Sequence, residues 1–272
     1  MENINWIERA ENTRFEVYNY INGAPCPIEG KQAIEKRSAR NDALLYQFPS
    51  GTIDDVDAAV QSASAAFASG AWSKATLSER KSVLLKLASL IDENAEQLAL
   101  FESVDVGKPI TNALNGDIPG ASETIRDAAE GLDKLYSFSG IDGTGPNLMC
   151  QVRKPLGVVA AIVGWNFPLV LAVGKVAPAL AVGNSVVLKP SEFSPLSACR
   201  LAELATQAGL PDGVLNVVNG SGAVVGEAIA LHTDVALLSF TGSTATGKQL
   251  MVSAGRSNMK RLMLECGGKS PF

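Results

Sequence analysis

The chain has 272 residues, of which 46% are hydrophobic and 19% are charged, so it is long enough to bury one large core or two smaller ones. Its formal net charge of -5 and its lack of a basic run argue against nucleic acid and anionic membrane surfaces as partners. We therefore expect it to bind small molecules and other copies of itself.

The cysteines and apolar stretches bear on the compartment. The longest apolar stretch, around residues 158–182, is interrupted by polar residues and prolines and cannot span a membrane, and the polar N-terminus has no signal-peptide core. We infer a cytoplasmic protein. The four cysteines lie far apart without a CxxC pair, so neither a disulfide framework nor a metal site is indicated. They are Cys26, Cys150, Cys199 and Cys266.

Helices are predicted for most of the first half. Apolar residues recur at helical spacing over residues 54–100, with Thr52 and Ser78 as plausible N-caps, and a second helical pattern covers roughly 117–135. The glycine-rich turn GIDGTGPN and the alternating segment NLMCQVRKP then predict a protruding β-hairpin over 138–154.

After Pro155, short strands rich in Val, Ile and Leu alternate with helices. The strands are GVVAAIVG, NSVVLKP, GVLNVV, VALLSF and RLMLE, and the helices are expected near 169–181, 195–208, 223–231 and 242–254. This alternation is typical of βαβ units, and uniformly apolar strands indicate a parallel sheet buried on both faces. The predicted fold class is α/β, a Rossmann-like doubly wound parallel sheet with N-terminal helices.

Ligands of such a sheet bind at the carboxyl ends of its strands. The loop from Gly242 to Gly247 follows a strand and opens a helix, whose free N–H groups and positive end favour an anion. A tight turn without a ligand is the simpler alternative. The loop lacks GxGxxG and is close to the P-loop pattern GxxxxGK[ST], but Gln249 replaces the Ser or Thr that an NTPase needs.

Polar side chains at other strand ends are candidates for chemistry. Asn166 in GWNFP offers an amide donor for a developing oxyanion, or caps a turn. Lys189 and Glu192 in LKPSE form either a ribose-binding pair or a solvated turn. Glu265 ends the strand RLML, where burial would raise its pKa for general-base catalysis unless Lys269 pairs with it.

Together GWNFP, LKPSE, PDGVLNVVNGSG, FTGSTATGK and LECGGKSP resemble the aldehyde dehydrogenase superfamily, over about residues 15–272. The segments DIPGA and SNMKRLMLECGGKS are most similar in sequence to those of bacterial enzymes acting on gamma-glutamyl-gamma-aminobutyraldehyde and related amino-aldehydes. The resemblance implies attack of a cysteine thiolate on an aldehyde, hydride transfer to the nicotinamide and hydrolysis of the thioester. The alternative is a non-catalytic NAD-binding or interaction module derived from such an enzyme.

The resemblance also assigns roles. Asn166 would hold the oxyanion, Glu265 would activate the deacylating water and Lys175 would relay its proton. The coenzyme is expected to be NAD rather than NADP, because Glu192 would repel a 2′-phosphate. The other coenzyme contacts implied are Val163, Trp165, Lys189, Gly222, Gly226, Thr241, Gly242, Ser243 and Gly247.

The resemblance implies a domain plan, and the sequence differs from the family in two ways. Residues 1–267 would form the NAD-binding domain, with 138–154 as an oligomerisation excursion, and 268–272 would be the stub of an absent, aldehyde-binding catalytic domain. The family's nucleophilic cysteine lies well beyond the glutamate motif, so we expect a truncated, inactive chain whose parent is a homo-oligomer. Gly164 replaces the family's usual proline, which predicts a looser Asn166 loop.

Overall fold

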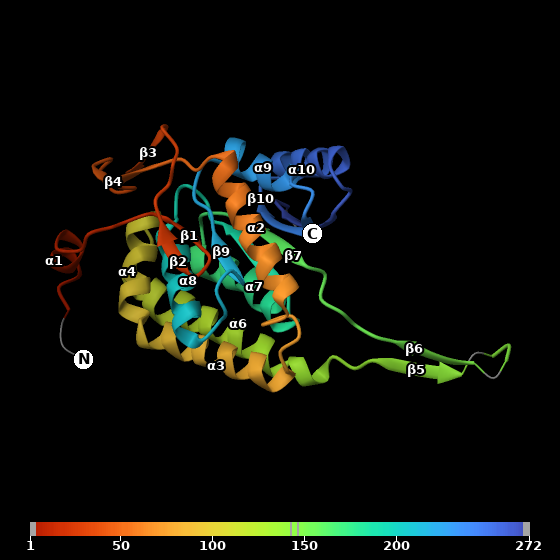
Figure 1. Ribbon diagram of the computed structural model, residues 1–272. Coiled ribbons are helices and arrows are strands. Elements are labelled where there is room, and N and C mark those ends of the chain that lie inside the picture. The colour runs from red at the N-terminus through yellow and green to blue at the C-terminus, as the bar shows by residue number, and fades with distance from the viewer. Residues whose placement is uncertain (1–3, 142, 146, 269–272) are drawn as a thin grey trace.

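The computed structural model describes residues 4–141, 143–145 and 147–268, so most of the stub expected at 268–272 lies outside the described residues. Figure 1 shows a sheet with helices on both faces and a hairpin that projects from one side. The sheet has seven strands in the order β11-β10-β7-β8-β9-β1-β2. They are β1 (Asn19–Ile21), β2 (Ala24–Cys26), β7 (Val158–Ile162), β8 (Ser185–Lys189), β9 (Leu215–Val217), β10 (Val235–Gly242) and β11 (Arg261–Cys266).

The centre of the sheet agrees with the sequence prediction. Strands β7 to β11 run parallel to one another, and every residue of β7, β8 and β9 is buried. The prediction is wrong at the edges. β1 pairs antiparallel with β9 through Tyr20 and Val217, and β11, paired with β10 alone in the described sheet, has only exposed and partly buried residues.

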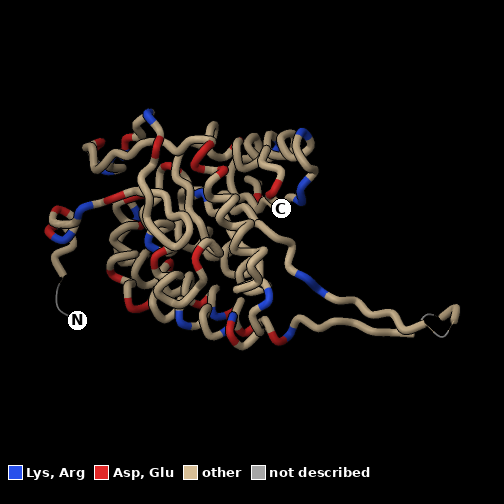
Figure 2. The backbone as a smooth tube through the Cα atoms, in the orientation of Figure 1, with Lys and Arg blue, Asp and Glu red and all other residues tan. Residues whose placement is uncertain are grey.

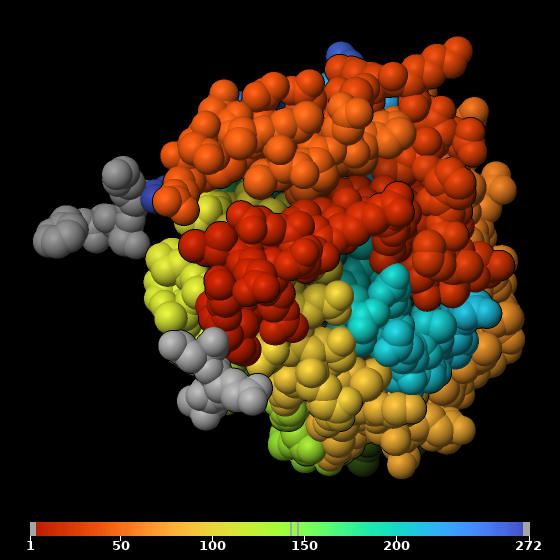
Figure 3. Space-filling view, turned by 90° about the vertical axis from the view of Figure 1, so that its left-hand side faces the viewer, coloured from red at the N-terminus to blue at the C-terminus, as the bar shows by residue number. Residues whose placement is uncertain are grey.

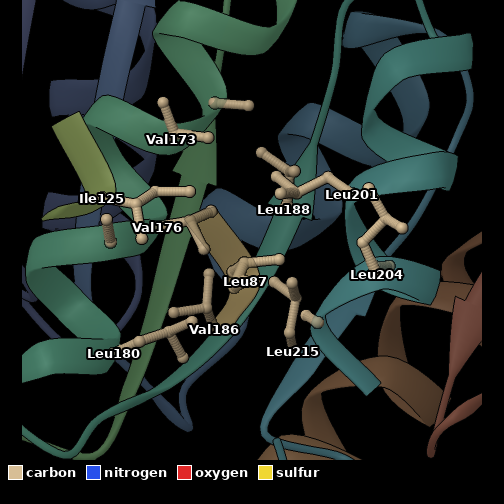
Figure 4. Packing of buried hydrophobic residues seen from close by; sticks show 14 of the residues in the cluster. Leu87, Ile125, Val173, Val176, Leu180, Val186, Leu188, Leu201, Leu204 and Leu215 are labelled. Carbon is tan, nitrogen blue, oxygen red and sulfur yellow. The ribbon is translucent and has the colours of Figure 1, made fainter. Parts of the chain in front are cut away.

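Helices cover both faces of the sheet, as a doubly wound fold requires. One core cluster joins α3, α4, α6, α7 and α8 to the sheet, and Figure 4 shows its side chains meeting between α7, β8 and α8. A second cluster joins α2, α9 and α10 to the opposite face. The helices are α1 (Trp6–Glu11), α2 (Ile53–Ser69), α3 (Leu77–Glu93), α4 (Ala95–Val106), α5 (Ile110–Asn112), α6 (Ile118–Glu130), α7 (Pro168–Ala181), α8 (Leu196–Ala208), α9 (Glu227–Leu231) and α10 (Thr244–Arg256).

Two helix starts show how the sequence sets the element bounds. Thr52 is the N-cap of α2 and forms a capping box with Asp55, as expected for a helix beginning there. The N-cap of α3 is Thr76, so the predicted cap at Ser78 is wrong. Thr76 is the N-cap because Glu79, three residues later, accepts a hydrogen bond from the Thr76 backbone N–H and completes a second capping box.

The N-terminal region contains more strand than the sequence predicted. Besides β1 and β2, it forms an antiparallel hairpin of β3 (Ala33–Arg37) and β4 (Leu44–Pro49). Figure 3 shows the N-terminal residues, in red, running across one face of the molecule beside the yellow residues of α4. Arg9 of α1 forms an ion pair with Glu96 of α4 at 2.5 Å, which attaches this segment to the helical layer.

The predicted hairpin is present as β5 (Phe138–Ile141) and β6 (Leu148–Gln151), and we call residues 138–154 the arm. All residues of both strands are exposed, including Phe138 and Ile141. Figure 2 shows Lys and Arg on the arm only near its base. The arm is therefore an apolar surface away from the core. Among the described residues, no helix combines the length and apolar character needed to cross a membrane.

Candidate functional site

A cavity of about 860 Å³ opens where β7, β8, β10 and β11 end. Its size suits a small organic ligand, and its position is the one at which open parallel sheets bind their ligands. Most of the residues singled out from the sequence line it together. These are Val163, Trp165, Asn166, Lys189, Glu192, Gly222, Thr241, Gly242, Ser243 and Glu265.

Three of the predicted residues lie behind the cavity wall. Gly247 packs against β11, since a Cβ there would lie 2.6 Å from Cys266 Sγ. Gly226 borders the buried stem of Lys189, with its notional Cβ 3.8 Å from Lys189 Cδ. Lys175 donates a hydrogen bond from Nζ to Ser239 Oγ at 3.1 Å. Burial lowers the pKa of Lys175 while the charge of Glu265 acts to raise it, so the two groups interact electrostatically.

The start of α10 forms one wall of the cavity. Ser243 is its N-cap and accepts a hydrogen bond from Thr246 N at 3.1 Å, while other N–H groups of the first turn lack partners within the helix. Gly242 precedes it, and a Cβ there would lie 2.5 Å from Phe240 Cζ and would displace that ring. The wall therefore favours an anion. Lys248 does not line the cavity, which argues against the P-loop alternative.

Lys189 and Glu192 form an ion pair in the cavity wall. Lys189 is 2% exposed, and its Nζ lies 3.4 Å from Glu192 Oε2 and donates to Pro190 O at 2.8 Å. Burial acts to raise the pKa of Glu192, but the Lys189 charge and the Gly222 N–H lower it overall, so the carboxylate is ionised. The alternative of a solvated turn is wrong for Lys189.

Asn166 and Glu265 both line this cavity. Asn166 is exposed between β7 and α7, and α7 has Phe167 at its N-cap with no side-chain cap hydrogen bond, so Asn166 is not capping that helix. Glu265 is also exposed. The burial that we expected for it is wrong because β11 is an edge strand of the described sheet. Lys269, its alternative partner, lies outside the described residues.

The four cysteines differ in their relation to the cavity. Cys199 is buried, and its Sγ donates a hydrogen bond to Tyr18 O. Burial raises the pKa of its thiol to about 11. Cys26 lies on β2 and Cys150 on the exposed arm. Cys266 follows Glu265 on β11, and alternation along the strand directs its Sγ toward Gly247 of α10. Of the four, Cys266 alone lines the cavity with Asn166, and its Sγ is packed against Gly247.

Several residues of the cavity wall were not predicted. Ser191 and Phe193 line it from the segment after β8, and Thr246 lines it from the first turn of α10. The motifs that contain or adjoin them, KPSE and TGSTATG, were recognised, so proximity to a strand end was the available signal. Phe240 also contributes, although its strand was expected to be wholly core.

The same fold and motifs occur in known proteins. Residues 28–272 match the model of the aldehyde dehydrogenase family. The chain is 49% identical over 265 residues to the NADP/NAD-dependent aldehyde dehydrogenase PuuC of Escherichia coli (strain K12), covering 97% of this chain and 53% of that protein. It is 45% identical over 252 residues to an aminoacetaldehyde dehydrogenase of Pseudomonas aeruginosa, covering 93% and 51%. The chain thus spans about half the length of these curated relatives.

Solved structures show the same likeness. An indole-3-acetaldehyde dehydrogenase of P. syringae, in complex with NAD+ and IAA, has a TM-score of 0.94 and 48% identity, and the match covers 98% of this chain and 54% of that chain. The gamma-glutamyl-gamma-aminobutyraldehyde dehydrogenase from Burkholderia cenocepacia J2315 has a TM-score of 0.92 and 44% identity, with coverage of 98% and 54%. The likeness extends over nearly all of the present fold.

Proposed function

Because the chain belongs to the aldehyde dehydrogenase family, we propose that its cavity binds NAD and carries part of the machinery for oxidising an aldehyde to its carboxylic acid. The observation that carries the proposal is the shared lining: an ionised pair suited to a ribose, a helix N-terminus suited to a pyrophosphate, and Asn166 with Glu265 all border one cavity. A scaffold without catalysis has no use for the last two.

The residues present fit NAD. The free N–H groups at the start of α10, with Ser243 at its N-cap, would hold the pyrophosphate. Lys189 and Glu192 would contact the adenosine ribose, with Gly222 and Gly226 on the adenine side. The remaining proposed contacts, which line the cavity or support its wall, are Val163, Trp165, Thr241, Gly242 and Gly247.

We place the preference for NAD over NADP at Glu192. Its lowered pKa keeps it negative, so it accepts ribose hydroxyl hydrogen bonds and repels a 2′-phosphate. Lys189 would attract a 2′-phosphate only weakly, because its Nζ already contacts Glu192 and Pro190 O. The relative from Escherichia coli is named NADP/NAD-dependent, so we expect discrimination rather than exclusion.

For the reaction, bound NAD supplies the hydride acceptor. The Asn166 side-chain amide donates to the oxygen on which negative charge develops, and it would lower the barrier as oxyanion-hole donors do. Glu265, open to solvent, takes a proton from the water that cleaves the thioester. Lys175, behind it, relays that proton. We place the attacking thiolate outside these 272 residues, since Cys26, Cys150 and Cys199 do not line the cavity and Cys266 Sγ is packed against Gly247.

For the substrate and assembly, we propose an amino-aldehyde and a homo-oligomer. The first rests on relatives named for aminoacetaldehyde and gamma-glutamyl-gamma-aminobutyraldehyde. The second rests on the exposed apolar arm, which a second copy would cover. The aldehyde itself would be bound largely by residues outside this chain.

The test is calorimetric titration of the 272-residue chain with NAD and NADP, followed by an aldehyde-dependent NADH assay on the same sample. We expect saturable NAD binding, weaker NADP binding and no turnover. Turnover by this chain alone would overturn our placement of the thiolate, and a folded sample without NAD binding would contradict the coenzyme site.

A further inference from the structure

Two buried carboxylates on α4 lie outside the mechanism described above. Glu102 is fully buried and Asp105 is 1% exposed. Ionised carboxylates are rarely buried unless they are paired or hydrogen-bonded, because desolvation is costly. Their partners therefore indicate what the fold gains from them.

Glu102 bonds to the two helices that begin beside the cavity. Its Oε1 accepts from Leu169 N, in the first turn of α7, at 3.0 Å, and from Ser197 Oγ, in the first turn of α8, at 2.6 Å. A carboxylate at a helix N-terminus is favourable for the helix dipole. Asn166 lies three residues before Leu169, and Glu192 lies five residues before Ser197. One oxygen atom thus links both site loops.

Neighbouring charges hold the same loops. Lys108, which follows α4, lies 3.9 Å from the ring centre of Phe167 and pairs with Asp117. Asp105 accepts from Leu196 N at 3.1 Å and from the Tyr46 hydroxyl. Unlike Glu102, Asp105 has bonds to α8 and β4 but none to α7 among the contacts of the described residues.

We propose that Glu102 is a positioning residue, whose carboxylate between the first turns of α7 and α8 holds the Asn166 loop and the Lys189–Glu192 loop in their relative places. The proposal rests on the proposed function of those loops. Glu102 does not line the cavity. Its effect passes through its hydrogen bonds to Leu169 N and Ser197 Oγ, so it sets the positions of the two loops and takes no part in the reaction.

Protonation of Glu102 gives the proposal a measurable signature. Burial raises the pKa of Glu102 to about 7, against the lowering effects of the Ser197 and Leu169 hydrogen bonds and of the Lys108 charge. Asp117 adds to the rise, and Asp105, near Lys36 and Tyr46, has its own pKa raised to about 7 by burial. Hydrogen bonds to a charged acceptor are stronger than those to a neutral one. The Asn166 loop is therefore held more firmly above pH 7 than below it.

Trp165, in the Asn166 loop and exposed, reports on this directly. We would measure acrylamide quenching of its fluorescence between about pH 5.5 and 8.5, a range spanning the raised pKa of Glu102. The signal of a Trp165→Phe variant would be subtracted to remove Trp6 and Trp72. In the wild type, we expect quenching to decrease as the pH rises through about 7. In Glu102→Gln, quenching should remain at every pH as strong as it is in the wild type at low pH.

Asp105→Asn is the matched control, because it removes an equally buried carboxylate one turn away that does not contact α7. The Trp165 titration should persist in it. Ser197→Ala is a second test that keeps the charge: losing a hydrogen bond that lowers the pKa of Glu102 should move the midpoint upward. An unchanged titration in Glu102→Gln, its loss in Asp105→Asn, or an unmoved midpoint in Ser197→Ala would each overturn the proposal.

Calorimetry separates this proposal from the proposed function. We expect Glu102→Gln to bind NAD about fivefold more weakly than the wild type at pH 8, the difference between a charged and a neutral hydrogen bond. If the wild type binds no NAD, the coenzyme site is wrong, but the Trp165 titration still tests the positioning by Glu102. If the wild type binds NAD and Glu102→Gln matches it at every pH, the positioning role is wrong.

Discussion

At the residue scale, single atoms decide how the cavity is charged and shaped. Glu192 carries the negative charge that, in the proposed coenzyme site, would face a ribose, and it keeps that charge because Lys189 Nζ and the Gly222 N–H stabilise it. Gly247 allows α10 to lie against β11, because its missing Cβ is the space that Cys266 Sγ occupies. Each of these features can be removed by one substitution.

Replacing Glu192 by Gln should weaken the discrimination against NADP. The neutral amide still accepts a ribose hydrogen bond, but no longer repels a 2′-phosphate, so the ratio of the NADP to the NAD dissociation constant should fall roughly tenfold. Calorimetric titration measures both constants. Glu123→Gln, which removes an exposed carboxylate of α6, is the control for net charge and should leave the ratio unchanged. Equal ratios in both variants would argue against Glu192 as the discriminating group.

Two glycine substitutions should have opposite signs. Gly247→Ala places a Cβ 2.6 Å from Cys266 Sγ, so that side chain must move, and we expect the unfolding free energy to fall by about 1 kcal/mol. Gly174→Ala, at an exposed position inside α7 with no atom within 4 Å of the new Cβ, should instead stabilise by roughly 0.5 to 1 kcal/mol. Urea unfolding measures both. A Gly247→Ala chain as stable as wild type would show that β11 and α10 are not tightly packed here.

At the element scale, strands β7 and β8 could be predicted because their apolar runs have one explanation, burial on both faces. Strand β1 could not, because the described structure attaches it to β9 through the single pair of Tyr20 with Val217. Glu102 was missed for a similar reason. It lies within a helix, and its partners Leu169 and Ser197 are 67 and 95 residues away. The cavity residues were accessible to sequence reasoning because they follow strands directly.

The start of α3 provides a test at this scale. Thr76→Ala removes the side chain that accepts from Glu79 N, and should lower the unfolding free energy by about 1 kcal/mol. Ser78→Ala, two residues on, removes a hydroxyl that has no capping role and should change it by less than about 0.5 kcal/mol. Thermal unfolding followed by circular dichroism compares them. A larger loss of unfolding free energy in Ser78→Ala than in Thr76→Ala would indicate that Ser78 is the N-cap.

At the scale of the whole molecule, the buried carboxylates make stability depend on pH. The carboxyl pKa values of Glu102 and Asp105 are raised by burial to about 7 in the folded chain, against roughly 4 when unfolded. The folded state therefore holds these protons more tightly. Their contribution to stability is fully present below about pH 4 and is lost as the pH rises through about 7.

The difference between wild type and Glu102→Gln isolates one of these groups. Between roughly pH 4.5 and 7, the wild type should lose up to about 1.4 kcal/mol per pH unit more than the variant, and the two curves should run parallel above that range. Urea unfolding at a series of pH values gives both curves. Parallel curves across the acid range would mean that Glu102 titrates alike in the folded and unfolded chains.

The arm has a further consequence, for proteolysis. Its strands pair only with each other in the described structure, and Val152 and Arg153 beside them are exposed. An exposed segment with so few contacts is where a protease cuts a native protein first. Arg153 offers trypsin a site, whereas Pro155 shields the bond after Lys154. The rate of that one cut, followed against protein concentration, would report how much of the arm is covered by a second copy, because a covered arm cannot enter the protease.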